Sequence, residues 1–248
     1  SAYSEKAVKR IFKLKKRPRI NPLIIHYYDF EQASKDAILN KDFFTLYKKF
    51  CPGPITFVLK KKNDSKICSS ATAGLNTVAL RFPSHKAVRN LIKKTNFPLA
   101  MPSANISSGL SSVSALDVYD EFKNNLKIII DGGSSKFGIE STVIDLTTKP
   151  KILRPGIISA KDIKNLLRKN LSKKKTNIRS PGMMTKHYSP GIPIFLNKKP
   201  KNVSDAYIVF GKRHKNRKNF FNLSKKADLK EAAANLYKTM RKIKKKGY

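Results

Sequence analysis

The stretch with the most chemical potential reads KLKKRPRINPLIIH, from Lys13 to His26. An apolar stripe at helical spacing precedes it, and Lys15 falls on that stripe rather than on the solvent face. Pro18 ends the helix and favours an extended backbone at Arg17. A short apolar run then predicts a buried strand that leads to His26. Two cations and a histidine held in this way suit an anionic small molecule. The alternative is a Lys-rich helix face followed by a turn.

A further candidate cation is Arg81, near the end of the predicted strand Thr77–Phe82 (TVALRF). Alternation along the strand places it on one face with Thr77 and Ala79, which leaves room in front of its guanidinium. The alternative is an arginine on an edge strand that points to solvent.

A run rich in hydroxyl groups begins at Ser103-Ala104-Asn105, directly after a predicted short strand at Pro98–Pro102. Small hydroxyl residues and backbone N–H groups at a strand-to-helix junction can bind an anion. The alternative is a flexible serine-rich loop that caps the helix Ala115–Phe122.

The elements that must position these residues alternate between helices and strands, which predicts an α/β fold with a twisted mixed sheet and flanking helices. Beside those named above, we expect strands at Ile55–Lys60, Ser141–Leu146 and Ile152–Arg154, helices at Asp42–Phe50, His85–Lys94 and Ala160–Arg168, and a loop at Asn63–Asn76.

The polar stretch after Asn170 and the segment Ser180–Pro190 (SPGMMTKHYSP) read as a linker. A second small α/β unit follows, with strands expected at Ile194–Leu196 and Tyr207–Phe210 and a helix from Asp228. The predicted division is therefore a first domain at 1–169, a linker at 170–191 and a partial second domain at 192–248.

The net charge of +37 favours binding to nucleic acid or an anionic surface, but 42 of the 53 basic residues are lysines spread over the whole length. Nucleic-acid recognition relies more on arginine, so we interpret the charge as compositional background. Two cysteines without metal-ligand spacing favour a reducing cytosol and disfavour a disulfide scaffold or a zinc site. No apolar run is long enough to span a bilayer, and no catalytic triad or Walker-type loop can be argued from spacing.

Six motifs follow one another along the chain: K-x-R-P-x-x-N-P-L-I-x-H at Lys15–His26, C-P-G-P-I-T at Cys51–Thr56, L-R-F-P at Leu80–Pro83, P-S-A-N at Pro102–Asn105, E-S-T-V-I-D at Glu140–Asp145 and R-P-G at Arg154–Gly156. Together, and nearly from end to end, they resemble the YrdC/Sua5 family, the threonylcarbamoyl-AMP synthases. SPGMMTKHYSP resembles the interdomain linker of the longer, two-domain Sua5 form, whose second domain is Rossmann-like.

The resemblance implies a nucleotidyltransferase that makes threonylcarbamoyl-AMP and pyrophosphate from L-threonine, bicarbonate and ATP with Mg²⁺ as a substrate complex, without a permanent cofactor. It also implies downstream tRNA threonylcarbamoyl transferase machinery that modifies adenosine 37, possible contact with tRNA, no membrane partner and a cytoplasmic location.

The site residues that the resemblance implies fall into four groups. Lys15 and Arg17 would be catalytic; the ATP contacts would be Lys15, Arg17, Asn21, Thr77, Ser103, Asn105, Ser111, Arg154 and Tyr188; the threonine contacts would be His26, Arg81, Met101 and Ser141; and His187 with Tyr188 would form a lid. No residue is expected to hold a resident metal.

The chain departs from the family pattern in a few places. Ser108 stands where a glycine is expected, and Ser112-Val113 replaces the usual Pro-Thr. A first strand with a P-T-E-T-x-Y-G-L-like segment is expected before Ser1, and further strands of the second domain after Tyr248, so the chain is expected to be a fragment.

The rival hypothesis is a YrdC-like module that binds tRNA or double-stranded RNA without chemistry. Buried cations at Lys15, Arg17 and Arg81 would favour the enzyme, and an exposed stripe would favour RNA. A YrdC-like domain of a carbamoyltransferase maturation protein is disfavoured because the cysteines of its zinc fingers are missing.

Overall fold

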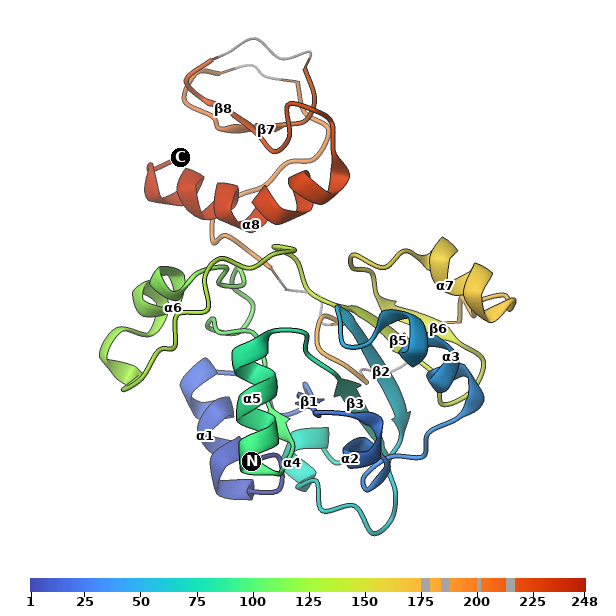
Figure 1. Ribbon diagram of the computed structural model, residues 1–248. Coiled ribbons are helices and arrows are strands. Elements are labelled where there is room, and N and C mark those ends of the chain that lie inside the picture. The colour runs from blue at the N-terminus through green and yellow to red at the C-terminus, as the bar shows by residue number, and fades with distance from the viewer. Residues whose placement is uncertain (175–178, 184–187, 200–201, 213–216) are drawn as a thin grey trace. The chain divides into compact units, whose positions relative to one another are not determined.

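The structure is a computed structural model that describes residues 1–174, 179–183, 188–199, 202–212 and 217–248 (Figure 1). The chain forms two compact units. The first unit comprises Ser1–Pro102 and Glu140–Thr185, and the second comprises Ser103–Ile139 and Lys186–Tyr248.

The first unit is built on a six-stranded sheet with the order β4-β1-β3-β2-β5-β6. Its strands are β1 (Ile24–His26), β2 (Ile55–Lys60), β3 (Thr77–Arg81), β4 (Leu99–Ala100), β5 (Thr142–Asp145) and β6 (Lys151–Arg154). β1 is parallel to β3 and β2 is parallel to β5, whereas the other three pairs are antiparallel. The predicted mixed α/β sheet is therefore confirmed.

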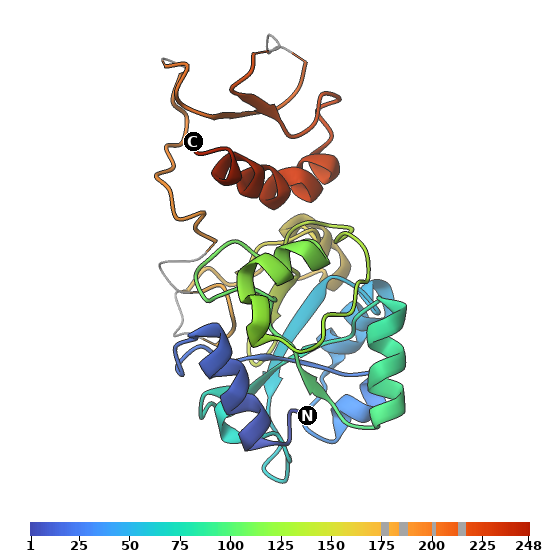
Figure 2. The ribbon, with the colours of Figure 1, turned by 90° about the vertical axis from the view of Figure 1, so that its left-hand side faces the viewer.

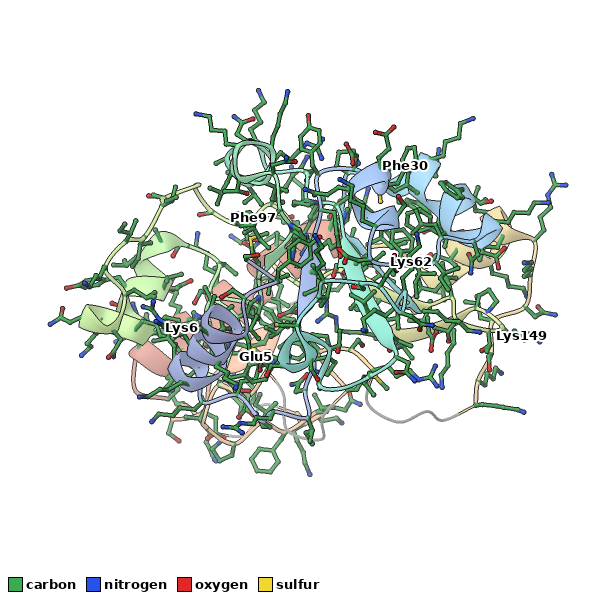
Figure 3. All side chains as sticks on the ribbon, turned by 90° about the horizontal axis from the view of Figure 1, so that it is seen from below. Glu5, Lys6, Phe30, Lys62, Phe97 and Lys149 are labelled. Atoms are coloured by element: carbon green, nitrogen blue, oxygen red, sulfur yellow. The ribbon has the colours of Figure 1, made fainter. Side chains whose placement is uncertain are left out.

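One face of the sheet carries the main core. Ile25, Leu80, Phe57 and Ile144 lie on this face and pack with side chains from the helices α1 (Glu5–Lys15), α2 (Phe30–Ser34), α3 (Lys41–Phe50) and α7 (Ala160–Leu167). Phe30 of α2, labelled in Figure 3, contacts two aromatic rings of α3, Phe44 and Tyr47, edge to face. Aromatic pairs of this kind fix α2 and α3 against each other.

The start of helix α1 and its buried side follow from its sequence. The hydroxyl of Ser4 accepts a hydrogen bond from the Ala7 N–H and caps the first turn. Glu5, visible at the start of α1 in Figure 3, accepts a hydrogen bond from the Ser70 hydroxyl of the short helix α4 (Ser69–Thr72). Lys15 lies on the buried side, 4% exposed, as the apolar stripe predicts.

The opposite face of the sheet has a much smaller apolar cluster, made of Ile24, Val58, Ala79 and Val143. Among the residues that the structure describes, no helix contributes a buried side chain to this cluster. Residues two positions further along the same strands point to the same side, because side chains alternate along a strand. This face therefore has room for polar side chains.

The second unit contains α6 (Ala115–Phe122), a short 3₁₀ helix (Lys123–Asn125), the parallel strands β7 (Tyr207–Val209) and β8 (Phe220–Asn222), and the long helix α8 (Leu229–Lys245). Figures 1 and 2 show α8 running beside the β7–β8 ribbon. The strand predicted at Ile194–Leu196 is wrong: these side chains are 50–81% exposed, and no described strand pairs with the segment. Without a neighbouring strand, an extended backbone has no ladder partner.

A few other elements differ from expectation. The structure adds α4 within the predicted loop Asn63–Asn76, and α2 and β8 were not predicted. α5 occupies Lys86–Thr95. Over the residues described, no helix is both long and apolar enough to cross a membrane.

Candidate active site

Four strands of the first unit bring their polar ends to the same edge of the sheet. β1 ends at His26 and β3 at Arg81, and these two residues are register partners. β2 runs antiparallel to β3, so Thr56, near the start of β2, pairs with Arg81. Ser141 directly precedes β5, which is parallel to β2. By alternation these side chains share the face of the small apolar cluster.

Arg81 is not on an edge strand, because β3 lies between β1 and β2. Its Nε atom is fully buried and has no hydrogen-bond partner among the described residues. Burial, followed by the positive charge of Arg154, lowers the pKa of this guanidinium to about 10, while Cys51 and Glu140 act in the opposite direction. An arginine at pKa 10 is still charged at neutral pH, so the site presents a cation that favours an anionic ligand.

His26 is neutral at physiological pH. Burial, followed by the charge of Arg81, lowers its pKa to about 3, while backbone contacts with Ile24 and Leu99 act in the opposite direction. Its Nδ1 lies 3.2 Å from the Ile24 carbonyl oxygen. A carbonyl can only accept, so Nδ1 carries the proton of the neutral ring. The histidine therefore supplies a polar wall without adding a third positive charge.

Two hydroxyl groups and Arg154 form a buried network beside Arg81. The hydroxyls of Thr56 and Ser141 are 2.7 Å apart. Arg154 Nη2 donates to the Ser141 hydroxyl at 3.0 Å and to its carbonyl oxygen at 2.9 Å, and Nε donates to the same carbonyl. Thr56 was not among the residues selected from the sequence, although its place in the C-P-G-P-I-T motif at the start of β2 could have identified it.

A second set of predicted residues gathers near the opposite end of β1 and β3. Arg17, 7% exposed, donates from Nε to the Asn21 carbonyl at 2.9 Å and from Nη2 to the Asn21 side chain and the Pro22 carbonyl, both at 2.8 Å. These bonds hold the turn that leads into β1. Thr77, at the start of the parallel strand β3, has a buried hydroxyl without a partner among the described residues.

The two remaining predicted residues of this unit lie close to those sets. Lys15 is the last residue of α1, two positions before Arg17. Met101 follows β4, and its N–H donates to the Ile24 carbonyl at 3.2 Å, two residues from His26. β1 and β3 end at His26 and Arg81, whereas Asn21 precedes β1 and Thr77 begins β3.

The described part of the linker in the first unit lies against β5 and β6. Arg179 forms an ion pair with Asp145 at 3.1 Å and donates to the Thr147 hydroxyl. Arg154 Nη1 donates to the Pro181 carbonyl at 3.5 Å. This part of the predicted linker is therefore connected to the arginine that holds Ser141. His187 falls outside the described residues.

The serine-rich segment belongs to the second unit, where Asn105 organises it as a closed loop. The Asn105 amide accepts from the Ser103 hydroxyl at 2.6 Å and donates to the carbonyls of Ile106 and Gly109 at 2.7 and 3.0 Å. Asn105 and Ser111 are buried. Ser108 has a φ of +71°, which explains why a glycine is the expected residue there.

Tyr188 also belongs to the second unit. Its ring stacks on that of Tyr237 in α8, with centroids 5.7 Å apart and an interplanar angle of 23°. The next residue, Ser189, donates its N–H to the Ser108 carbonyl at 2.9 Å. The end of the linker is thus attached to the serine-rich loop.

Comparison with known proteins finds family matches in both parts of the chain. Residues 1–156 match the Sua5/YciO/YrdC family, described as telomere recombination, and residues 158–248 match the family described as the C-terminal domain of threonylcarbamoyl-AMP synthase. The threonylcarbamoyl-AMP synthase of Pyrococcus abyssi is 40% identical over 210 residues, which are 82% of this chain and 61% of the relative. That of Bacillus subtilis is 36% identical over 203 residues, 79% of this chain and 58% of the relative.

The fold agrees with a solved structure of the same kind. The crystal structure of P. abyssi Sua5 complexed with L-threonine superposes with a TM-score of 0.84 at 34% identity and covers 99% of this chain and 78% of that chain. The chain spans about three fifths of the length of the curated relatives above. On these matches, the chain belongs to the Sua5/YciO/YrdC family and has its two-domain, Sua5-type arrangement.

Proposed function

We propose that the protein is an L-threonylcarbamoyladenylate synthase. The observation that carries the proposal is the buried Nε of Arg81, without a described partner, in a cluster with Arg154, two hydroxyls and a neutral histidine. A positive, partly desolvated cluster of this kind is suited to a small carboxylate. Relatives named threonylcarbamoyl-AMP synthase, and a solved relative complexed with L-threonine, support this assignment.

The threonine would bind at the shared edge of β1, β3 and β5. The guanidinium of Arg81 would face the threonine carboxylate, and the hydroxyl of Ser141 would contact its polar groups. Neutral His26 and the nearby Met101 would line the same place. Thr56 extends this set, because its hydroxyl lies 2.7 Å from that of Ser141.

The reaction consumes ATP, supplied with Mg²⁺, and bicarbonate. The amine of threonine is first carboxylated by bicarbonate, with loss of water. A carbamate oxygen then forms a bond to the α-phosphorus of ATP while the bond to the bridging oxygen breaks, and pyrophosphate leaves with that electron pair. Such a displacement requires alignment and charge stabilisation rather than a protein nucleophile. Lys15 and Arg17 would supply the charge, with Asn21, Thr77, Arg154, Ser103, Asn105, Ser111 and Tyr188 as nucleotide contacts.

The product is a mixed anhydride that water destroys. His187 and Tyr188 would act as a lid that limits hydrolysis. A transferase that places the threonylcarbamoyl group on adenosine 37 of tRNA would consume the product, and the reaction would take place in the cytoplasm. Direct contact with tRNA or double-stranded RNA is the competing role. The burial of Lys15 and Arg17 supports the enzyme over an RNA-binding module.

The test is the release of pyrophosphate from ATP by the purified protein, with threonine and bicarbonate each supplied or omitted. We expect release only when both are present. Release that is independent of threonine would contradict the proposal, as would RNA binding without any threonine-dependent turnover. Serine in place of threonine reports the strictness of the acceptor.

A further inference from the structure

The second unit joins two parts of the sequence that the family matches assign to different domains. The segment Ser103–Ile139 lies within the first match, and α8 lies within the C-terminal match. One face of α8 carries Ala234, Tyr237 and Arg241, which are spaced by three and four residues and so point the same way. All three contact that segment or the end of the linker.

Arg241 makes the most extensive of these contacts. Its Nη2 donates to the Leu110 carbonyl at 2.6 Å and lies 3.4 Å from the Ser112 hydroxyl, and its Nε donates to the Ser111 carbonyl at 3.4 Å. The side chain is 14% exposed. One guanidinium therefore holds three successive residues of the serine-rich loop.

Arg241 also lies close to two carboxylates of α6, and these carboxylates accept hydrogen bonds from the loop backbone. Arg241 Nη1 lies 3.5 Å from Glu121, and Nε lies 3.9 Å from Asp117. Glu121 accepts the Ile106 N–H at 3.0 Å, and Asp117 accepts the Val113 N–H at 3.0 Å. Both ends of the Ile106–Val113 segment are thus fixed by carboxylates that Arg241 partly neutralises.

The rest of the α8 face contacts the end of the Ser103–Ile139 segment and the end of the linker. A Cβ added to Gly138 would lie 2.5 Å from the backbone of Ala234, so the chain passes directly against the helix there. Tyr237 stacks on Tyr188, whose neighbour Ser189 bonds to Ser108. The loop and the linker end are therefore held by residues one helical turn apart.

We propose that Arg241, on the C-terminal helix α8, sets the conformation of the loop Ser103–Val113 and in this way is a positioning residue for ATP. The inference rests on the proposed function, since it takes Ser103, Asn105 and Ser111 as nucleotide contacts. The C-terminal domain thereby gains a specific role, because α8 presets the backbone of a loop that the first family domain supplies. Preorganisation of this kind contributes affinity because the ligand does not have to order the loop on binding.

The test compares Arg241→Met and Arg241→Lys with the wild-type protein. The readout is the dissociation constant of a non-hydrolysable ATP analogue, with that of L-threonine measured on the same preparation. We expect Arg241→Met to weaken the analogue about 10-fold, equivalent to about 1.4 kcal/mol, and to leave threonine unchanged. Arg241→Lys keeps the positive charge but not the branched set of donors, so it should bind the ATP analogue more tightly than Arg241→Met and more weakly than wild type. Amide exchange at Ile106 and Val113 should become faster in Arg241→Met.

Lys245→Met is the matched control on the same helix. Lys245 pairs with Asp120 of α6 at 2.6 Å, and it is 59% exposed. Its loss should leave the affinity for the ATP analogue unchanged. Equal affinity in Arg241→Met and wild type would overturn the proposal. A parallel loss of threonine and nucleotide affinity would also overturn it, because that pattern indicates general destabilisation.

A second pair of variants tests the helix contact without removing a charge. Gly138→Ala places a methyl group against Ala234, whereas Gly133→Ala has nothing within 4 Å, and both positions have positive φ. We expect Gly138→Ala to weaken the ATP analogue more than Gly133→Ala does; equal effects would count against α8 as the support. If the wild-type protein itself binds threonine but no ATP analogue, the proposed function fails first, and the role of Arg241 fails with it.

Discussion

At the scale of single residues, the chemistry of the candidate site is dominated by two arginines that share a buried space with few acids. Burial, followed by the charge of Arg154, lowers the pKa of Arg81. Arg154 donates to Ser141, and the Ser141 hydroxyl contacts Thr56, which is the register partner of Arg81. Like charges kept close together are costly unless an anion offsets them. This cost favours the binding of a carboxylate and disfavours a merely structural role for Arg81.

The first prediction concerns Arg81 itself. Arg81→Met should weaken the binding of L-threonine by about 10- to 100-fold, because a charge-assisted hydrogen bond is typically worth about 1.5–3 kcal/mol. Calorimetric titration with threonine measures the effect. Arg10→Met, which removes an exposed arginine of α1, is the control. Unchanged threonine affinity in Arg81→Met would exclude Arg81 from the site.

The second prediction concerns His26 and pH. Its pKa is about 3 in the folded protein, below the ordinary value of 6.5, so the unfolded chain binds a proton more readily between these values. The contribution of His26 to the free energy of unfolding should therefore be complete above about pH 6.5 and decrease as the pH falls towards 3, by at most about 1.4 kcal/mol per pH unit.

The free energy of unfolding in urea is measured for wild type and His26→Asn between pH 3 and 6.5. The carboxylates titrate in both proteins, so the difference between the two isolates the contribution of His26. The difference in unfolding free energy between the two should shrink as the pH falls. A difference that is independent of pH would contradict a neutral, buried His26.

At the scale of elements, several predictions from sequence hold because local rules decide them. The alternation in β3 correctly puts Arg81 on the face of Ala79, opposite Leu80, and the stripe of α1 correctly turns Lys15 inward. The strand at Ile194–Leu196 is wrong because an apolar run indicates a strand only where a partner exists to receive its hydrogen bonds. α2 was not predicted because its five residues are too few to show helical periodicity.

The third prediction concerns the serine-rich loop. Ser108 has a φ of +71°, a conformation that costs a non-glycine residue about 1–2 kcal/mol. Ser108→Gly should therefore raise the free energy of unfolding by about 1 kcal/mol, after the greater freedom of glycine in the unfolded chain is subtracted.

Thermal or urea unfolding measures this change, and Ser107→Gly is the matched control. Ser107 is not among the residues with positive φ, so its replacement should be neutral or destabilising. Destabilisation by Ser108→Gly would mean that the hydroxyl of Ser108 matters more than its backbone conformation.

At the scale of the whole molecule, the compact units do not coincide with the halves of the sequence. The sequence placed residues 103–139 in the first domain, and the family match agrees, but in the structure they form one unit with α8. No local pattern predicts this, because Arg241 and its partners Leu110 and Glu121 are 120 to 131 residues apart. The predicted division at residues 169 and 191 remains a prediction.

The distribution of charge is also a property of the whole chain. The net charge of +37 would suit an RNA-binding surface, yet Lys15, Arg17 and Arg154 are among the buried residues. Sequence could identify these three positions from motifs. It could not show that Arg17 makes three hydrogen bonds to Asn21 and Pro22, because those bonds depend on the folded turn.

The measurement that tests the central claim most directly is the identification of the product by mass spectrometry. The purified protein is incubated with ATP, Mg²⁺, L-threonine and bicarbonate labelled with heavy carbon. We expect threonylcarbamoyl-adenylate that carries the label in its carbamoyl group, together with pyrophosphate in equal amount. Threonyl-adenylate without the label, or AMP formed without threonine, would contradict the assignment of this chain as a threonylcarbamoyladenylate synthase.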